Sequence, residues 1–398
     1  MNLRIKEIAL TGYRSLHAIR FPVGQLTVFV GANGVGKTNL YRALQLLQSA
    51  AAGSLARELA SEGGMESALW AGKRAANKPA RIKLQVGVGT DHESRNGQHE
   101  FDYSVELGVA YSYEIEVGVR ASSMAAFPLE PQVKEERLID RGGRRPLTLL
   151  ERRGPHATAI DNEGHKQTVE PPLLPTETAL ASLQDPGRFG DVDLLRRTML
   201  DWRFYHDFRT DRLSPLRQPC LAVTTPTLAS DGSDLAAVFA TLVHIREDTT
   251  ELDRAVDDAF AGAQLVVPAP ERTASFGLIM PDYPKRVFDA AELSDGTLRY
   301  LALAGALLGY RLPAFIALNE PETSLHPELL EPLARTITHA AQRTQIWVVT
   351  HSERFADALA ASANVKPRTV IKRDGGTWID GLKLHGDFDE DDETGDTP

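Results

Sequence analysis

The residues with the clearest chemical potential form one short run near the N-terminus. Gly31-Ala32-Asn33-Gly34-Val35-Gly36-Lys37-Thr38 fits the pattern G-x-x-x-x-G-K-[ST] at every fixed position. Glycines let backbone N–H groups converge on phosphate oxygens, and a helix that starts there adds a favourable dipole. Lys37 is expected to reach the β- and γ-phosphates of a nucleotide, and Thr38 to offer its hydroxyl to Mg²⁺. A chance match in a Gly-rich turn is the alternative.

Three further polar clusters follow far along the chain, and all of them could act on a phosphate. Leu293–Thr297 opens a predicted helix with Ser294 as its N-cap, so Ser294 and Gly296 form a second anion-binding helix start. Asn319–Pro327 contains Glu320, which is suited to polarise a water for attack on a γ-phosphate. His351, in the third cluster, could sense or stabilise that phosphate. Taken singly, such a glutamate is usually a helix cap and such a histidine a bystander, but their order after a phosphate loop favours a shared site.

The predicted elements around these clusters alternate between strand and helix. Leu26–Val30 is a nearly continuous apolar run, typical of a strand buried on both faces, and a helix is expected from Lys37 to Leu47. Strand Ala314–Leu318, helix Pro327–Gln342, strand Gln345–Thr350 and helix Glu353–Ala361 follow. This rhythm predicts a parallel sheet, and ligands bind at the carboxyl edge of such sheets.

The remaining segments are less uniform. Residues 3–30 are strand-rich, and further strands are expected at Arg81–Gly89, Phe101–Leu107, Tyr111–Val119, Thr369–Arg373 and Thr377–Leu384. Helices are expected near Leu194–Arg203, at Leu235–Arg246 and over Leu293–Leu308. Between Gln132 and Pro219 the pattern degrades, and a looser lobe is expected there. No heptads run between residues 50 and 290, which excludes a long coiled-coil arm.

With these motifs in this order, the chain resembles the ABC-type ATPase heads of the RecF, SMC and OLD-like group, and looks closest to RecF-like single-chain AAA family ATPases without a coiled coil. Tyr13-Arg14-Ser15 and Val30–Asn39 resemble the family's start, and Leu293–Thr297 looks like its signature. Asn319-Glu320-Pro321 resembles the end of Walker B, Ser324–Pro327 the D-loop and His351 the switch histidine. The resemblance covers about residues 1–120 and 285–385.

The resemblance implies a fold, a mechanism and a set of site residues. The fold class is α/β, a P-loop NTPase ABC-type head with a mixed or parallel sheet flanked by helices, N-terminal antiparallel strands and an inserted α/β lobe. Two heads would pair head to tail around ATP and Mg²⁺, as an ATP-dependent homodimer. Nucleotide binding is assigned to Gly31, Asn33, Gly34, Gly36, Lys37, Thr38, Asn39 and Arg14. Catalysis falls to Glu320 and His351, the trans signature to Ser294, Asp295 and Gly296, the D-loop to Ser324 and His326, and Mg²⁺ to Thr38, Asn319 and Glu320.

The sequence departs from the family pattern in two places. The usual Walker B aspartate is Asn319, and a neutral amide holds Mg²⁺ less strongly than a carboxylate, so hydrolysis is expected to be slow unless Thr38, the phosphates and Glu320 suffice. The usual Q-loop glutamine is also not obvious. Gln85 and Gln132 are both candidates by position.

Length and composition are consistent with this reading. The chain has 398 residues and a net charge of −10, with a single cysteine, Cys220, which excludes an internal disulfide framework and a Cys-rich zinc site. No signal sequence or membrane span is apparent, so a cytoplasmic location without membrane contact is expected. The expected domains are 1–125 and 286–385 for the two halves of the head, 126–285 for the inserted lobe and 386–398 for an acidic disordered tail. Seven acidic residues and no basic one lie between Asp387 and Asp396, so the negative balance does not exclude nucleic acid.

The partner stays open at this point. One hypothesis is a molecular switch that acts on double-stranded DNA in repair, replication maintenance or phage defence, because Arg141, Arg144, Arg145, Arg152 and Arg153 cluster in the middle lobe. Those arginines are equally compatible with a solvated charge run. The nearby aromatic residues Trp202, Phe204, Tyr205 and Phe208 are expected in the core. The alternative is a regulatory ATPase that controls a toxin or nuclease effector without DNA contact. A transporter subunit is disfavoured because nothing suggests membrane coupling, and a GTPase because no NKxD motif occurs.

Overall fold

The computed structural model describes residues 3–73, 79–90, 107–119, 127, 129–383 and 386–388. The chain divides into two compact units. Unit 1 comprises Met1–Gly24, Ala32–Trp202 and Thr369–Pro398, and unit 2 comprises Gln25–Gly31 and Arg203–Arg368. The boundary after Trp202 falls inside the expected insertion 126–285, and the division into head and insertion stays a prediction. The expected acidic tail lies, except for residues 386–388, outside the described residues.

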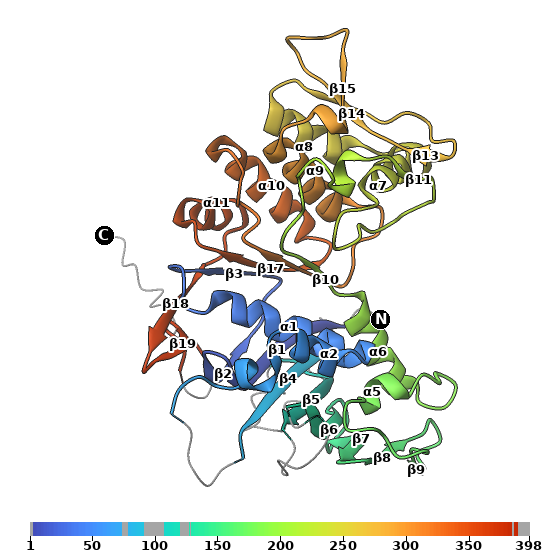
Figure 1. Cartoon of the computed structure of the whole chain (residues 1–398), viewed down its shortest axis with the longest axis vertical. Coiled ribbons are helices and arrows are strands. Elements are labelled where there is room, and N and C mark those ends of the chain that lie inside the picture. The colour runs from blue at the N-terminus through green and yellow to red at the C-terminus, as the bar shows by residue number, and fades with distance from the viewer. Residues whose placement is uncertain are drawn as a thin grey trace. The chain divides into compact units, whose positions relative to one another are not determined.

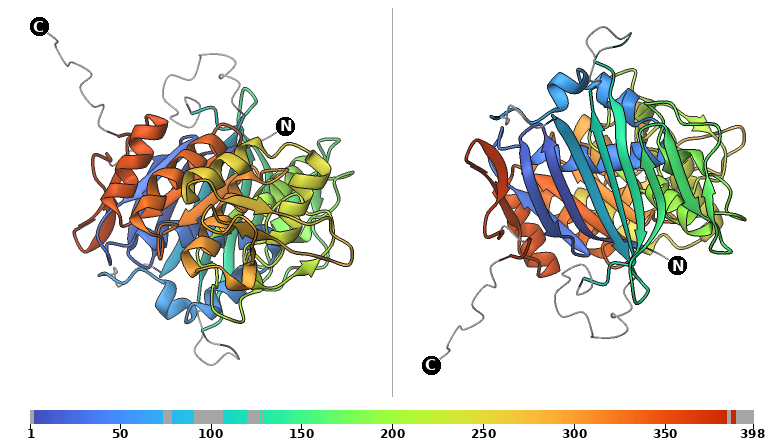
Figure 2. Two further views of the ribbon diagram at one scale, coloured as in Figure 1. Left: turned by 90° about the horizontal axis from the view of Figure 1, so that it is seen from above. Right: turned by 90° about the horizontal axis from the view of Figure 1, so that it is seen from below.

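Unit 1 is built on an eight-stranded antiparallel sheet in the order β2-β1-β4-β5-β6-β7-β8-β9 (Figure 1; Figure 2, right). Its β4 alternates as the sequence predicts, with Ile82, Leu84 and Val86 buried. The expected strand at Phe101–Leu107 lies outside the described residues apart from Leu107. The strands are β1 (Arg4–Tyr13), β2 (Leu16–Pro22), β4 (Arg81–Gly89), β5 (Tyr111–Gly118), β6 (Gln132–Asp140), β7 (Leu147–Arg153), β8 (His156–Ile160) and β9 (Lys166–Thr168).

Helices cover one face of this sheet (Figure 1). The predicted helix after the phosphate loop is confirmed as α1, and its buried Leu40, Leu44 and Leu47 form the expected apolar stripe. It ends at Gly53, whose left-handed φ of 77° suits glycine. The helices of unit 1 are α1 (Lys37–Ala52), α2 (Leu55–Ser61), α3 (Gly64–Ala68), α5 (Ala179–Ser182) and α6 (Gly190–Asp201), and the hairpin of β18 (Arg368–Arg373) and β19 (Gly376–Ile379) completes it.

The expectation of a loose lobe after Gln132 is wrong for residues 132–168, because β6 to β9 form a regular antiparallel extension of the sheet. Charged residues hid the strands from the sequence pattern. On one face they pair across strands, as Arg137 does with Glu151 (3.7 Å). On the other face Glu136 and Arg152 are buried, where an alternating strand normally carries apolar residues.

Glu136 and Arg152 are fully buried, and each satisfies main-chain groups of the segment 174–180. The Glu136 carboxylate accepts hydrogen bonds from the backbone N–H groups of Ala179 (2.7 Å) and Leu180 (2.8 Å) and from the Tyr113 hydroxyl (2.9 Å). The Arg152 guanidinium donates to the carbonyls of Gly154, Leu174 and Glu177. Arg152 is therefore not available to a nucleic acid.

Burial raises the pKa of Glu136, although its backbone hydrogen bonds oppose the shift. A carboxyl group whose pKa is higher in the folded than in the unfolded state binds more protons when folded. The protonation-dependent part of its contribution to stability is therefore complete below the ordinary glutamate pKa and is lost as the pH rises through the folded value. The hydrogen bonds that the carboxylate accepts are a separate contribution.

Unit 2 contains the predicted parallel sheet, in the strand order β10-β16-β17-β3. The strands are β3 (Leu26–Val30), β10 (Arg203–Tyr205), β16 (Phe315–Asn319) and β17 (Gln345–Thr350), and β16 and β17 are buried throughout. This burial on both faces explains why their sequences are uniformly apolar rather than alternating. Phe29 packs against Trp347 with ring centroids 4.6 Å apart.

Helices of unit 2 pack over one face of this sheet (Figure 1). They are α7 (Leu235–Thr241) with a π-helical continuation at Leu242–Arg246, α8 (Thr250–Phe260), α9 (Asp295–Leu308), α10 (Leu330–Ala340) and α11 (Glu353–Ala363). Unit 2 also contains two small antiparallel sheets. One consists of β11 (Cys220–Leu221) and β13 (Thr273–Ala274). The other consists of β12 (Gln264–Val266), β14 (Gly277–Ile279) and β15 (Val287–Asp289).

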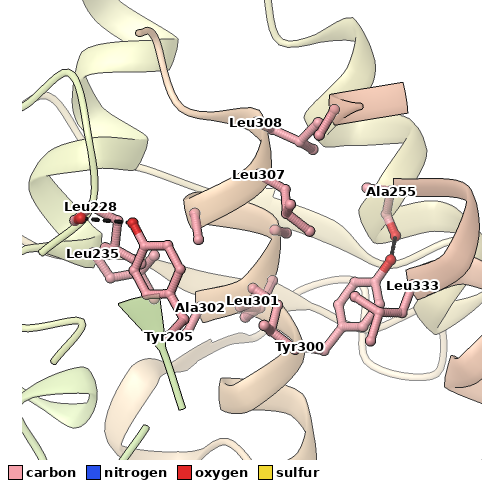
Figure 3. Packing of buried hydrophobic residues seen from close by; sticks show 14 of the residues in the cluster. Tyr205, Leu228, Leu235, Ala255, Tyr300, Leu301, Ala302, Leu307, Leu308 and Leu333 are labelled. Carbon is pink, nitrogen blue, oxygen red and sulfur yellow. Dashed lines mark hydrogen bonds between the residues drawn. The ribbon is translucent and has the colours of Figure 1, made fainter. Parts of the chain in front are cut away.

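The core of unit 2 centres on α9, which is buried from Leu298 to Leu308 (Figure 3). Two tyrosines keep their polar ends satisfied inside it. The Tyr205 hydroxyl donates to the carbonyl of Leu228 (2.8 Å) and the Tyr300 hydroxyl to that of Ala255 (2.9 Å). Burial raises the pKa of Tyr300 to about 12. Of the four aromatic residues expected to be buried, Tyr205 and Phe208 belong to this core. Phe204 and Trp202, the latter a residue of unit 1, are buried as well.

Replacing Glu136 tests how far its hydrogen bonds hold the 174–180 segment. Glu136→Ala removes the acceptor of three buried donors, and we expect the free energy of unfolding to fall by about 3 kcal/mol. The measurement is denaturant unfolding of the full chain at neutral pH. Glu135→Ala, on the exposed face of the same strand, is the matched control and should cost under about 1 kcal/mol. Equal losses in the two variants would contradict the assigned role.

Candidate nucleotide site

The phosphate loop in unit 1 has the backbone that its glycines require. Gly34 and Gly36 adopt left-handed φ values of 78° and 100°, and Gly36 immediately precedes α1. Lys37 is only 4% exposed, and its Nζ donates to the carbonyl of Ala32 at 2.8 Å, so the ammonium folds back over its own loop. Thr38 follows in the first turn of the helix. The loop, the helix start and the lysine have the geometry of an anion-binding turn, and phosphate binding by these residues stays a prediction.

A chain of hydrogen bonds supports the loop from segments far away in sequence. The Asn39 side-chain amide donates to Ser15 Oγ (2.6 Å), Ser15 Oγ lies 2.6 Å from Thr377 Oγ1, and the Thr377 hydroxyl donates to the carbonyl of Val35 (2.6 Å). Since each hydroxyl has one proton, Ser15 donates to Thr377. A Cβ on Gly36 would lie 1.9 Å from Thr377 Oγ1, so the approach of β19 also requires glycine there.

Arg14 lies in the short turn between β1 and β2 with a φ of 47°. Its guanidinium pairs with Glu62 at 2.8 Å, and Glu62 also contacts Arg42 (3.3 Å) and accepts from the Tyr13 hydroxyl (2.8 Å). Burial and the nearby Glu62 carboxylate raise the pKa of Tyr13. A phosphate contact by Arg14 stays a prediction, and Glu62 is the residue that fixes its present orientation.

In unit 2, the strand register brings polar residues to one edge of the parallel sheet. Asn319 is opposite Val349 in neighbouring strands, and Thr350 is opposite Val30. Asn319, Glu320 and His351 therefore lie at the same carboxyl edge, where Gly31 begins the phosphate loop directly after Val30. We refer to His206, Asn319, Glu320 and His351 as the strand-end cluster. His206 joins it because Tyr205 is opposite Leu318.

Asn319 is the buried member of the strand-end cluster, with 1% of its surface exposed. Its Nδ2 donates to His206 Nδ1 at 2.6 Å, whereas its Oδ1 is buried and has no hydrogen-bond partner within the described part of the chain. An unsatisfied buried oxygen at this edge fits an oxygen-preferring ion such as Mg²⁺, or a water bound to it. No group of three or more His, Cys, Asp or Glu residues suited to a metal occurs among the described residues, and Mg²⁺ bound largely by phosphates and water needs none.

Glu320 follows β16 in a left-handed conformation with a φ of 50°, which is uncommon for a non-glycine residue and concentrates at functional sites. Its backbone N–H donates to the carbonyl of Val349 (2.7 Å), and its side chain is 30% exposed. The glutamate is thus fixed at its backbone while its carboxylate remains accessible to a water. His351 Nδ1 lies 3.8 Å from Glu320 Oε2.

Two buried charged residues hold the strand-end cluster in place. Glu322 accepts hydrogen bonds from the Thr350 hydroxyl and from the backbone N–H of His351 (3.2 Å), and its Oε1 lies 3.4 Å from His351 Nδ1. Arg299, on α9, donates to the carbonyls of Glu320 (3.3 Å) and His206 (3.2 Å). The helix that begins with the signature is therefore tied to two of the strand ends.

The signature segment has the predicted capped helix start. Ser294 is the N-cap of α9, and its Oγ accepts from the backbone N–H of Thr297 (3.2 Å), as expected. Arg217 fixes the turn before it by donating to the carbonyl of Leu293 (2.7 Å) and pairing with Asp295 (2.7 Å). The trans role of Ser294, Asp295 and Gly296 stays a prediction.

The D-loop lies beside the signature within the same unit. A Cβ on Gly296 would be 3.1 Å from the carbonyl oxygen of Ser324, so the two turns approach closely. Ser324 has a φ of 65°, and His326 caps the following 3-10 turn, Pro327–Leu329, by accepting from the N–H of Glu328 at 3.4 Å. Both predicted D-loop residues are exposed.

The two Q-loop candidates lie on strands of the antiparallel sheet. Gln85 on β4 donates to Ser112 Oγ (3.2 Å), and Gln132 on β6 is buried and accepts from Lys134 (2.9 Å). No described hydrogen bond links either glutamine to another predicted site residue of unit 1.

In the part of the chain that the structure describes, no helix combines the length and apolar character needed to cross a bilayer.

Several residues of the site carry no sequence signal that would have assigned them. His206, Arg217 and Arg299 act on backbone or side-chain groups that lie far away in sequence, and so do Ser15 and Thr377. Glu322 is different, because it is the second glutamate of Asn319-Glu320-Pro321-Glu322, and its place two residues after a predicted catalytic base was a usable signal.

A phosphate loop after one strand of a parallel sheet, a capped helix start at Ser294 and polar residues at the carboxyl edge give this chain the fold of an ABC-type P-loop ATPase head, of the SMC and RecF-like kind. Two solved SMC heads share the fold. One, bound to the C-winged helix domain of ScpA, has a TM-score of 0.51 and 14% identity, with 96% of this chain and 98% of that chain covered. The other, a Pyrococcus furiosus head with an extended coiled coil bound to the C-terminal domain of ScpA, has a TM-score of 0.50 and 14% identity, with 96% and 97% covered.

Comparison of the sequence with known protein families assigns this chain to one of them. Residues 26–357 match the family described as AAA domain, putative AbiEii toxin, Type IV TA system, and the chain belongs to this family. Comparison with curated proteins gave no match. The family and the fold imply use of a nucleotide, usually with Mg²⁺.

Thr377→Val tests the support of the phosphate loop. The change keeps the side-chain shape but removes the hydroxyl that links Ser15 to the carbonyl of Val35, so we expect ATP to bind about tenfold more weakly, or about 1.4 kcal/mol. Equilibrium titration with a fluorescent ATP analogue measures this. Thr369→Val, at an exposed position of the adjacent strand β18, is the control and should bind as the unchanged protein does. An unaltered affinity in Thr377→Val would show that the loop needs no such support.

Proposed function

We propose that this protein is an ATP-binding and ATP-hydrolysing molecular switch of the RecF-like type, active in the cytoplasm. The observation that carries the proposal is the shared edge: Asn319, Glu320 and His351 lie at the carboxyl edge of the sheet at which the phosphate loop begins. Parallel sheets bind ligands at this edge. A nucleoside triphosphate needs both a loop that binds its phosphates and side chains that act on its γ-phosphate.

The chemistry assigned to each residue follows from its surroundings. Backbone N–H groups from Gly31 to Lys37 and the Lys37 ammonium bind the phosphates. Thr38, Asn319 and Glu320 would hold Mg²⁺, directly or through water, and that ion would neutralise charge on the phosphates. Glu320 orients a water and accepts its proton, while the water oxygen bonds to the γ-phosphorus and the bond to the β–γ bridging oxygen breaks, which gives ADP and phosphate.

His351 is proposed as the residue that senses the γ-phosphate. Its Nδ1 faces both the Glu320 carboxylate (3.8 Å) and the Glu322 carboxylate (3.4 Å). The ring is proposed to donate a hydrogen bond to an incoming phosphate. Because Asn319 replaces a carboxylate, the ion is held less strongly and hydrolysis is proposed to be slow. Slow hydrolysis suits a switch, whose ATP-bound state must persist.

The switch itself is proposed to be dimerisation. At the N-terminus of α9, the Ser294 hydroxyl and the backbone N–H groups of Asp295 and Gly296 would bind the γ-phosphate of ATP held by a second copy, as a capped helix start binds anions. Arg299 supports this role, because it ties the same helix to the carbonyl of Glu320, the proposed base. Occupation of the signature by a partner's ATP is thereby linked to the strand end that carries the base.

Double-stranded DNA is the partner we favour, in repair, replication maintenance or phage defence. Support comes from the hairpin between β6 and β7, where Arg144 and Arg145 are exposed in a turn that contains no acidic residue. Arginines at an exposed hairpin can pair with phosphates of a duplex.

A regulatory ATPase that controls a protein partner is the second candidate. The family description favours it, because it names a putative toxin of a type IV toxin–antitoxin system. Both SMC heads of similar fold are also bound to domains of ScpA, so this fold accommodates a protein partner. DNA and protein partners differ in their salt dependence, since phosphate contacts weaken steeply with salt.

Glu320→Gln is the central test of the switch. The amide cannot accept the proton of the attacking water, so ATP should still bind while hydrolysis falls at least 100-fold, and dimers should accumulate. Sedimentation velocity with and without ATP measures the dimer, and phosphate release measures hydrolysis. Lys37→Ala is the contrasting variant, expected to lose ATP binding and to stay monomeric. Normal hydrolysis by Glu320→Gln would exclude Glu320 as the base.

The same variant distinguishes the two partners. With ATP present, adding a duplex at low salt should give a faster-sedimenting complex that dissociates as salt rises, and Arg144→Ala with Arg145→Ala should weaken it. A protein recovered in stoichiometric amount after nuclease treatment, without any DNA-dependent shift, would instead favour the effector-control function.

A further inference from the structure

His206 and Asn319 form a contact that the sequence motifs do not predict. They follow paired positions of two parallel strands, Tyr205 in β10 and Leu318 in β16, so their side chains start from adjacent strand ends. The Asn319 Nδ2 lies 2.6 Å from His206 Nδ1. A histidine that could be dismissed as an isolated neighbour of Asp207 in the sequence thus contacts the residue that stands at the Walker B position.

This contact decides which way the Asn319 amide points when His206 carries its ring proton on Nε2, because Nδ1 is then an acceptor. An amide has a donor at one end and an acceptor at the other, so an Nδ2 that donates to the imidazole leaves Oδ1 facing away from it. That Oδ1 is buried and finds no hydrogen-bond partner among the residues described. A buried unpaired acceptor is costly unless a ligand satisfies it. If Oδ1 and Nδ2 exchanged places, the Asn319 amide would present its N–H group to a cation and repel it.

The backbone of His206 is itself fixed. Arg299 donates to the His206 carbonyl at 3.2 Å and pairs with the neighbouring Asp207 at 3.3 Å. The same guanidinium, buried on α9, donates to the carbonyl of Glu320. His206 therefore sits in a constrained position relative to both Asn319 and Glu320, as a residue that orients a metal ligand must.

We propose that His206 is a positioning residue for Mg²⁺: by accepting a hydrogen bond from Asn319 Nδ2 at Nδ1, it keeps Asn319 Oδ1 directed to the ion or to a water on the ion. The inference rests on the proposed function, because the ion accompanies ATP. It explains how an asparagine serves where the related heads have an aspartate. A carboxylate presents an oxygen in either orientation, whereas an amide needs a second residue to choose its orientation.

A double-mutant cycle tests the proposal through metal binding rather than turnover. His206→Ala and His206→Asn are each made in the unchanged chain and in the Asn319→Asp background. Binding of mant-ATP is measured first in EDTA and then during a titration with Mg²⁺. The asparagine oxygen can occupy the place of the imidazole Nδ1, so His206→Asn is the conservative variant. His165→Ala, at an exposed histidine of unit 1, is the control.

The expected pattern is specific. His206→Ala should raise the Mg²⁺ concentration for half-maximal enhancement of binding about 10- to 100-fold, as loss of an outer-shell partner does, and leave binding in EDTA unchanged. His206→Asn should recover most of this loss. In the Asn319→Asp background, His206→Ala should shift the midpoint less than about twofold, because the carboxylate needs no orientation.

Three results would overturn the proposal. One is an unchanged Mg²⁺ midpoint in His206→Ala. Another is an equal loss of binding in EDTA, which would make His206 a structural residue. The third is the same shift in both backgrounds. If the unchanged chain bound no mant-ATP at all, the proposed function would fail, and this inference with it, so the two failures are distinguishable.

Discussion

Parallel pairing of β3, β16 and β17 is the constraint on which the site in unit 2 depends. Main-chain hydrogen bonds set Val30 beside Thr350 and Asn319 beside Val349, and every residue that follows a strand emerges at the same edge. Because these strands are buried on both faces, a shift in register would move apolar side chains out of the core. The packing that stabilises the sheet therefore also fixes which polar residues become neighbours.

Buried polar groups then position the residues at that edge. Glu322 and Arg299 are both largely buried, and each contacts main-chain groups of the strand ends rather than solvent. A buried charge is costly unless it is paired or hydrogen-bonded, so the contacts that each residue makes constrain the groups that it contacts. In unit 1, Ser15 and Thr377 do the same for the phosphate loop with uncharged hydroxyls.

Asn319, which we propose stands at the Walker B position, is a substitution that its surroundings can accommodate. A carboxylate at this position would bring a charge that binds a cation in any orientation, whereas the amide brings a smaller dipole with a direction. His206 supplies a direction through one short hydrogen bond, and the free oxygen is left at the edge where the loop begins. The motif alone predicts weakened Mg²⁺ binding. The hydrogen bond to His206 indicates instead that the Asn319 oxygen is held in one direction.

Local features could be predicted from the sequence alone: the phosphate loop, the apolar strands of the parallel sheet and the helix start at Ser294. The catalytic role of Glu320 was predicted from the same motifs and stays a prediction. The local features depend on residue types at short spacing, which local sterics and hydrogen bonding interpret directly. Strands β6 to β9 were not predicted from the sequence. The buried Glu136 and Arg152, and the paired charges on the other face, removed the alternation of apolar and polar residues that marks a strand. The contact of Thr377 with the phosphate loop and that of His206 with Asn319 are visible only in the folded chain. Those contacts join residues more than 100 positions apart, and no spacing rule reaches across such a distance.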